Sequence, residues 1–196
     1  MRIILGSSSP RRKELLGRIV NSFEIMVPDV DETPNPGEAP EAFCLRAAKD
    51  KAEAIARRIS GEGLLIASDT IVTIDGLILG KPKDHDDAVA MHERLQGRTH
   101  AVKTAITLLH THKGGFSEAT GVETTEVTFK PLSREQIEEY LSSIHYLDKA
   151  GSYAAQDNGA MIIASYRGSM TNVIGFPTAL FFRLLAETGL SPADLA

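Results

Sequence analysis

Short apolar runs alternate with helical apolar patterns along the first part of the chain. Residues 3–5 are consecutive aliphatics followed by a glycine and three serines, which is typical of a short buried strand. A helical period follows over residues 10–19, and residues 23–27 alternate like a second strand. The acidic, proline-rich residues 28–40 predict an irregular loop. Residues 41–59 carry apolar side chains at the spacing of a long amphipathic helix.

Turn and capping signals organise the rest of the chain. Asp75 and Gly76 form a two-residue hairpin signal between two apolar runs. Ser133 and Gln136 form a capping box that starts a helix. The other predicted elements are strands over 64–67, 71–74, 77–80, 101–112 and 122–129, helices over 85–95, 133–141 and 177–187, and short alternating segments over 160–165 and 172–174. This interleaving predicts an α/β fold with a mixed twisted sheet and flanking helices, in one domain over residues 1–196.

Composition and charge narrow the function classes. The chain is 42% hydrophobic and has a formal net charge of −5, which argues against a nucleic-acid binder that relies on a general basic field. Cys44 is the single cysteine, so neither an intrachain disulfide nor a CxxC pair can form. No apolar stretch has the length that a signal peptide or a membrane span needs. We therefore expect a cytoplasmic protein with no nucleic-acid partner and no membrane partner.

The stretch SSSPRR near the N-terminus predicts an anion site. Ser9 fits the N-cap position and Pro10 the first position of a helix. Arg11 and Arg12 then fall in the first turn, where cations oppose the helix dipole unless an anion joins them. Serine hydroxyls such as that of Ser7, backbone N–H groups and two guanidinium groups would bind a polyphosphate well. The alternative is a solvated basic helix start.

A second candidate lies around Asp69, which follows an apolar run. An ionised carboxylate there is costly if it is buried without a partner. The hairpin register sets Lys81 opposite Thr70, so that these residues and Asp69 become neighbours at one end of the hairpin. This arrangement suits a carboxylate that holds a divalent metal or deprotonates water, beside a lysine that neutralises phosphate. An ordinary cross-strand charge pair is the alternative.

Three further polar residues have both a functional and an ordinary interpretation. Glu32 could supply a second carboxylate for a metal, or it could belong to a solvated loop. Lys51 flanks the apolar stripe of the long helix, where its ammonium could enter a cleft or extend to solvent. The amide of Gln156 can donate and accept hydrogen bonds together, as base recognition requires, although a lone glutamine is commonly a surface residue.

The order of these motifs resembles the Maf family from Ile3 to about Leu185. The motifs are SSSPRR, DVDE, KDKA, SDTIV, GKP, GRTH, DKAGSYAAQ and NVIGFP. The resemblance implies a nucleoside triphosphate pyrophosphatase that cleaves between the α and β phosphates with the help of Mg²⁺ or Mn²⁺. It also implies a fold like that of inosine triphosphate pyrophosphatases, with two lobes around a central cleft, and a homodimer as a possible assembly.

The matching positions imply roles for individual residues. Asp69 would be the catalytic base, and Glu32 would help it to hold the metal. The residues that would hold the triphosphate are Ser7, Ser9, Arg12, Lys51 and Lys81.

Substrate choice is implied by a smaller set. Arg11, Thr70 and Gln156 match positions at which the substrate groups of the family differ, and together they resemble the branch that acts on dTTP and UTP. The chain departs from the family pattern at Ser68, where a small apolar residue is common, and at residues 154–155, where Gly-Ile usually precedes the glutamine. The alternatives are a pyrophosphatase for 7-methyl-GTP or another purine nucleotide, and a nucleotide-binding regulator of septum formation.

Overall fold

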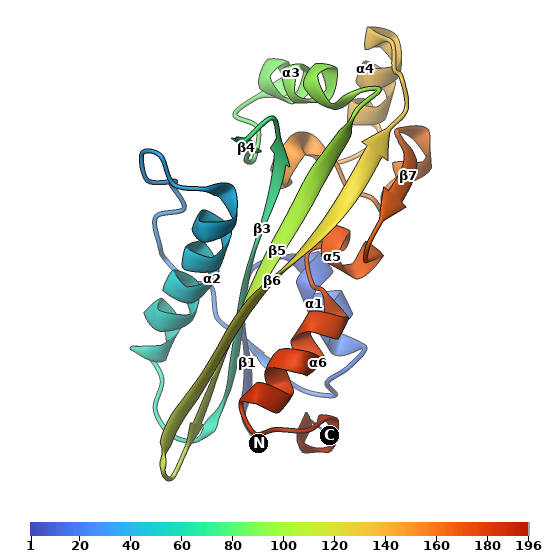
Figure 1. Ribbon diagram of the computed structural model, residues 1–196. Helices are drawn as coiled ribbons and strands as arrows, with labels where there is room; N and C mark the ends of the chain where they lie inside the picture. Colours follow the sequence, from blue (N-terminus) through green and yellow to red (C-terminus); the bar gives the residue numbers. More distant parts are fainter. Residues whose placement is uncertain (196) are drawn as a thin grey trace. The chain divides into compact units, whose positions relative to one another are not determined.

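The computed structural model describes residues 1–195 and contains a mixed sheet with flanking helices (Figure 1). Its strands are β1 (Ile3–Gly6), β2 (Glu24–Ile25), β3 (Gly63–Ile74), β4 (Leu77–Leu79), β5 (Thr99–His112), β6 (Gly115–Phe129) and β7 (Ile163–Arg167). Over the described residues the strand order is β2-β1-β3-β5-β6-β7, and β4 pairs with β3. β1 is parallel to β2 and β3, whereas the pairs β3 with β4 and β6 with β7 are antiparallel. The predicted α/β class with a mixed sheet is confirmed.

The helices are close to the predicted ones. They are α1 (Pro10–Gly17), α2 (Pro40–Ala56), α3 (His85–Leu95), α4 (Arg134–Ser142), α5 (Met170–Ile174) and α6 (Thr178–Glu187), with short 3-10 turns η1 (Ala150–Ser152), η2 (Gly159–Met161) and η3 (Pro192–Leu195). Ser9 caps α1 and the predicted capping box starts α4. Within residues 1–195, no helix has both the length and the apolar character that crossing a membrane requires.

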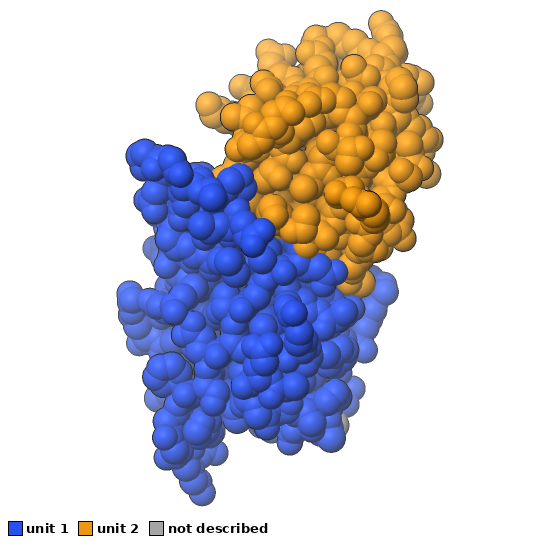
Figure 2. All heavy atoms as spheres, in the orientation of Figure 1, with its two compact units in different colours: residues 1–69, 104–123, 175–196 blue, residues 70–103, 124–174 orange. Residues whose placement is uncertain are grey.

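Two compact units make up the chain (Figure 2). Unit 1 comprises residues 1–69, 104–123 and 175–196, and unit 2 comprises residues 70–103 and 124–174. β3, β5 and β6 supply residues to both units, because one boundary falls within each of these strands, and a fourth boundary follows α5.

In unit 1, α2 and α6 flank the strands on opposite sides (Figure 1). The buried apolar cluster beneath α2 contains Ile4, Ala52, Ile55, Leu65, Ala67 and Leu109. A Cβ atom added to Gly6 would lie 2.7 Å from Ile55 Cδ1 and 3.3 Å from the Ile66 carbonyl oxygen. Glycine at the end of β1 therefore permits the close approach of α2 to the sheet.

Unit 2 has an aromatic core that includes two buried histidines. The His100 Nε2 atom lies 2.9 Å from the Tyr153 hydroxyl. The Phe129 ring packs edge-on against both rings, with centroid distances of 4.8 Å to His100 and 4.9 Å to Tyr153. His92 packs against Phe129 and Tyr140 in the same core. Such ring contacts stabilise the core beyond the burial of their area.

Hydrogen bonds from this core fix the backbone that leads to Gln156. The Tyr140 hydroxyl donates to the Ala154 carbonyl at 3.1 Å and accepts from the Ala154 N–H at 3.0 Å. His92 Nε2 lies 3.1 Å from the Ser152 carbonyl oxygen. Buried backbone groups need such partners, so the core determines the conformation of this segment as far as residue 154.

The second predicted strand and residues 172–174 differ from the prediction. The second strand shrinks from residues 23–27 to Glu24–Ile25, since its register with β1 contains only these two residues. Residues 172–174 lie in α5 instead of an extended segment. Ser169 accounts for the change, because its hydroxyl accepts from the Asn172 N–H at 3.3 Å and its carbonyl accepts from the Val173 N–H at 3.2 Å.

We predict an acid-sensitive stability that originates in His100. Burial lowers the pKa of His100 from its ordinary value of 6.5 to about 4, and the charge of His92 adds to this effect. As the pH falls through this window, the unfolded chain binds the proton before the folded unit does. The free energy of unfolding therefore falls as the pH drops from the pKa of the unfolded chain to that of the folded unit. The loss is about 3 kcal/mol in all.

Urea denaturation across this pH window measures the effect. His100→Gln keeps a hydrogen-bonding group for Tyr153 without a titrating ring, so it should show a shallower loss of stability with falling pH. The exposed His145 provides the matched variant, His145→Gln. An equal pH slope in the wild type and His100→Gln would contradict the assignment.

Candidate functional site

The candidate site of unit 1 begins where β1 ends beside its parallel neighbour β3. Gly6 on β1 pairs with Ala67 on β3, so Ser7 and the start of α1 lie at the same sheet edge as Asp69. β3 continues through Asp69 without the break predicted between residues 67 and 71. The neighbouring Ser68 is fully buried and, by strand alternation, lies on the opposite face of the sheet from Asp69.

A buried lysine lies between two carboxylates. The Lys51 Nζ atom is 2.6 Å from Asp69 Oδ1 and 3.1 Å from Glu32 Oε1. The side chains of Lys51 and Asp69 are 6% and 9% exposed, whereas that of Glu32 is 44% exposed. The Lys51 ammonium and the Asp69 carboxylate neutralise each other, and this offsets the cost of burying the Asp69 charge. The structure thus brings together three residues that the sequence analysis selected separately.

Helix α2 places Lys51 because it carries small residues on the face toward the sheet. Cys44, Ala47, Ala48 and Ala52 are buried on this face, and Lys51 belongs to the same buried stripe. The ammonium is buried with the stem, so Lys51 does not extend to solvent. Small neighbours leave the space that a long side chain needs to reach Asp69.

Cys44 contributes structure and not a nucleophile. Its Sγ atom donates to the Asp69 carbonyl oxygen at 3.5 Å. Burial and, to a smaller extent, the negative charge of Asp69 raise the pKa of the Cys44 thiol to about 12. The thiol is therefore protonated at neutral pH, whereas a reactive cysteine is a thiolate.

Arg12 reaches the same site from the first turn of α1. Its backbone N–H donates to Ser9 Oγ at 3.5 Å, its Nε atom donates to the Gly175 carbonyl at 3.0 Å, and its Nη1 atom donates to Ser7 Oγ at 3.2 Å. Burial lowers the pKa of Arg12, the Asp69 carboxylate opposes this effect, and the charge of Arg11 adds to it. Arginine keeps its charge in proteins, so a fixed cation lies near the carboxylates.

Gly175 is a site residue that was not predicted from the sequence. Its φ of 110° is a conformation that side chains with a Cβ rarely adopt, and this conformation turns its carbonyl toward Arg12. The only signal was the NVIGFP motif, which marks the position but does not indicate a contact with a residue so distant in the sequence.

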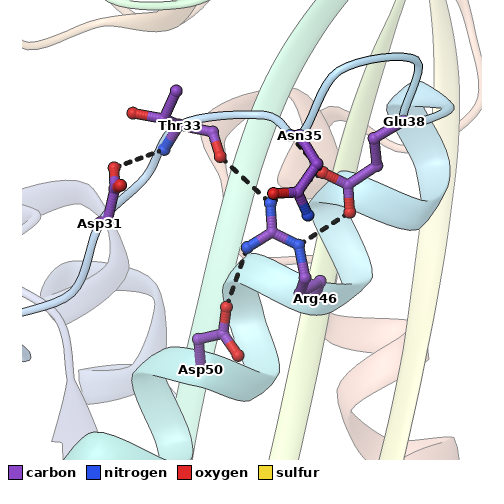
Figure 3. A network of polar contacts seen from close by, with 6 residues as sticks. All are labelled: Asp31, Thr33, Asn35, Glu38, Arg46 and Asp50. Atoms are coloured by element: carbon purple, nitrogen blue, oxygen red, sulfur yellow. Dashed lines mark hydrogen bonds and ion pairs between the residues drawn. The ribbon is translucent and has the colours of Figure 1, made fainter.

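A second missed residue, Arg46, orders the acidic loop that carries Glu32 (Figure 3). Its guanidinium donates to both carboxylate oxygens of Glu38 at 2.7 Å, to Asp50 Oδ2 at 3.1 Å and to the Thr33 carbonyl at 3.1 Å. The bond to Thr33 holds the residue that follows Glu32. The other residues of this network are Asp31 and Asn35, whose contacts with Thr33 and Glu38 close the loop.

The network also shifts the titration of Glu38. Hydrogen bonds from Arg46 and from the Asn35 backbone lower the pKa of Glu38 to about 2. Glu38 therefore stays ionised over the ordinary pH range, and its bidentate pairing with Arg46 persists. The acidic loop is thus held to α2 by charge-assisted hydrogen bonds, although it contains no helix or strand within residues 26–39.

Unit 2 contains the other predicted site residues. Thr70 is half-buried and follows Asp69 directly in β3, while Lys81 and Gln156 are exposed. The predicted pairing of Lys81 with Thr70 is wrong, because β4 ends at Leu79, which pairs with Val72. The chain leaves the ladder there, and the carbonyl of residue 80 accepts the N–H of residue 151 at 3.0 Å.

The carboxylates fit a divalent cation that brings some of its own ligands. Asp69 and Glu32 provide the oxygen ligands that Mg²⁺ and Mn²⁺ prefer, and Mg²⁺ sites commonly combine one or two carboxylates with waters and phosphate oxygens. Among residues 1–195, no group of three or more His, Cys, Asp or Glu side chains is placed to hold a metal ion. The donor set therefore suits a cation shared with a phosphate ligand.

Known proteins match this chain over nearly its full length. A family model described as "Maf-like protein" matches residues 2–188. A Myxococcus xanthus protein named "dTTP/UTP pyrophosphatase" is 43% identical over 188 residues, which cover 96% of this chain and 93% of that protein. A Carboxydothermus hydrogenoformans protein with the same name is 42% identical over 192 residues, which cover 96% and 100% of the two chains. A solved HAM1 protein from Coxiella burnetii aligns with a TM-score of 0.42 and 16% identity over 89% of this chain and 94% of that chain.

Gly175→Ala should weaken anion binding through Arg12. The added methyl group disfavours the observed φ, and the carbonyl that accepts from Arg12 Nε must then move. Hydrogen bonds to charged groups contribute enough that we expect about tenfold weaker binding of inorganic tripolyphosphate, measured by calorimetry.

Gly189→Ala is the matched control for this substitution. Gly189 also has a positive φ, of 79°, and lies in unit 1, but no atom lies within 4 Å of the position its Cβ would take. It should bind tripolyphosphate as the wild type does. Equal weakening in both variants would show that backbone strain, and not the Arg12 contact, causes the loss.

Proposed function

The chain belongs to the Maf family, and from this premise we propose that it is a nucleoside triphosphate pyrophosphatase that hydrolyses dTTP and UTP. The products are the nucleoside monophosphate and pyrophosphate. The 43% identical relative and the 42% identical relative, both named for this activity, support the substrate choice.

The observation that carries the reaction type is the group of buried Lys51 and Asp69 with the more exposed Glu32, beside Arg12. Two cations suit the phosphate chain of a nucleotide. Two carboxylates would repel phosphate in a module that only binds anions, so their presence supports hydrolysis, which must activate water and hold a cation. A regulator that merely binds nucleotide would gain nothing from them.

Asp69 acts as the general base in this proposal. It accepts a proton from a water molecule whose oxygen forms a bond to the α phosphorus in line with the leaving group. The bond from the α phosphorus to the bridging oxygen breaks, and pyrophosphate leaves with that electron pair. A divalent cation bound by Asp69 and Glu32 would supply charge neutralisation to the phosphates.

The cations of the chain stabilise the charge that develops on the leaving group. Arg12 is held by Ser7 and Gly175, and Lys51 lies beside the base, so both are assigned to the triphosphate. Ser9 and the first turn of α1 add backbone N–H groups that suit a phosphate oxygen. Lys81, an exposed cation of unit 2, is also proposed to bind phosphate.

Base selection is assigned to Arg11, Thr70 and Gln156. The Gln156 amide can donate and accept at once, which matches the carbonyl and N–H groups on the edge of uracil and thymine. Tyr140 and His92 support the backbone on which Gln156 is presented. A reducing compartment such as the cytoplasm is also proposed, because the single cysteine is a buried thiol.

A substrate panel tests the proposed function. Pyrophosphate release should be fastest with dTTP and UTP when CTP, 5-methyl-UTP and 7-methyl-GTP are compared in Mg²⁺ and in Mn²⁺. Faster turnover of 7-methyl-GTP would assign the chain to a different substrate group. Nucleotide binding with no turnover of any member would support the regulator instead.

Asp69→Asn should abolish most turnover while nucleotide still binds. General bases contribute about 10² to 10⁴ in rate, and the amide cannot take the proton, so we expect kcat to fall by that range. Asp29→Asn in the exposed acidic loop is the control and should keep wild-type kcat. Unchanged turnover in Asp69→Asn would remove Asp69 from the role of base.

A further inference from the structure

The Lys51 ammonium occupies the space between the two carboxylates that are assigned to the cation. Its Nζ atom lies within 2.6 Å of Asp69 Oδ1 and 3.1 Å of Glu32 Oε1, which are direct ion-pair distances. The lysine side chain is 6% exposed, so water shields this positive charge only weakly. In this state Lys51 already neutralises the oxygens that a divalent cation would use.

We propose that Lys51 is a built-in competitor that excludes the divalent cation until a nucleotide arrives. The protein then takes the cation as part of a cation–nucleoside triphosphate complex and does not hold it as a resident metal. The role of the nucleotide in this inference rests on the proposed function, whereas the competition between Lys51 and the cation does not.

Electrostatics gives the competition its direction. The two carboxylates and the Lys51 ammonium together carry a net charge of only −1. A divalent ion would also be repelled by the ammonium. Without Lys51 the two carboxylates would repel each other, and a divalent ion would relieve that repulsion. Even at the screening of bulk water, such charges a few ångströms apart change affinity by about tenfold or more.

A triphosphate offers Lys51 a new partner. Lysine is a compact charge on a flexible four-carbon stem, so the ammonium can rotate from the carboxylates toward phosphate oxygens. Arg12 is less suited to this movement, because its Nε and Nη1 atoms donate to the Gly175 carbonyl and the Ser7 hydroxyl. The nucleotide thus draws Lys51 away at the moment when it delivers the cation.

The donor set of the site favours the same order of binding. Among the described residues 1–195, no third His, Cys, Asp or Glu joins Asp69 and Glu32 at metal-binding distance. A cation held by two carboxylates alone would depend on phosphate oxygens and waters for its remaining ligands. Because the two carboxylates are already paired with Lys51, they would bind the cation only weakly in the absence of the nucleotide.

Titration of the nucleotide-free protein with Mn²⁺, followed by electron paramagnetic resonance, tests the proposal. Lys51→Met removes the charge and keeps much of the stem, and it should bind Mn²⁺ about tenfold more tightly than the wild type or better. Lys51→Arg keeps the charge and should bind Mn²⁺ as weakly as the wild type. A non-hydrolysable α,β-methylene analogue of dTTP should raise Mn²⁺ affinity in the wild type far more than in Lys51→Met.

Lys49→Met is the matched control. Lys49 lies on α2 and pairs with Glu118 at 2.8 Å, so its removal also deletes one positive charge and one ion pair from unit 1. Its Mn²⁺ affinity should equal that of the wild type. An equal gain in Lys49→Met and Lys51→Met would mean that net charge alone, and not the position of Lys51, governs binding.

Thermal unfolding supplies a second readout. Mn²⁺ should raise the Tm of Lys51→Met more than that of the wild type, because it restores the missing positive charge between the carboxylates. If Lys51→Met does not fold, the wild type and Lys51→Arg still decide, since tight Mn²⁺ binding by either without nucleotide overturns the proposal. The proposal is also overturned if Lys51→Met binds Mn²⁺ no more tightly than the wild type does.

The outcome is separable from that of the proposed function. A gain of Mn²⁺ affinity in Lys51→Met, with no pyrophosphate released by the wild type from any nucleotide, would reject the pyrophosphatase and keep the competitor role. Pyrophosphate release by the wild type, with no gain of Mn²⁺ affinity in Lys51→Met, would keep the pyrophosphatase and reject the competitor role.

Discussion

The contact of the Lys51 ammonium with Asp69 and Glu32 is the constraint on which the site depends. An unpaired carboxylate as buried as Asp69 would be costly, and an unpaired buried lysine would be equally so. Their pairing requires α2 to lie close to the sheet, which Gly6 permits. It also requires an ordered acidic loop, because Glu32 is the exposed member of the group. The close packing of α2 on the sheet and the ordered acidic loop of unit 1 both serve to bring these three side chains together.

The two units contribute different kinds of residues. Unit 1 contains the carboxylates and the two cations that suit phosphate chemistry, and each of them is held by a strand, a helix or the Arg46 network. Unit 2 contains Gln156, which follows a segment fixed by the hydroxyl of Tyr140. Unit 1 therefore carries a group of paired charges, and unit 2 carries a neutral amide at the end of a segment that its core holds.

The parts that the sequence predicted are those that local rules determine. The Ser9 cap, the Asp75-Gly76 hairpin and the capping box at Ser133 follow from backbone chemistry within a few residues, and all three are present. The continuity of β3 through Asp69 was not predicted, because the ion pair that makes it possible joins residues far apart in the sequence. The end of the β4 ladder at Leu79 was missed for a similar reason, since the bond between the backbones of residues 80 and 151 is also long-range.

The two cations of unit 1 differ in a way that suits opposite tasks. Arg12 is anchored by a backbone carbonyl and a hydroxyl, so the direction of its guanidinium is set before any ligand binds. Lys51 is anchored only by charge in its known contacts, and a stronger anion can therefore redirect it. A planar guanidinium with fixed donors can define where phosphate binds, while a flexible ammonium can change partners during binding. A lysine at position 12 would lose the first property, because a single ammonium could not donate to Gly175 and Ser7 with the same geometry as the planar guanidinium.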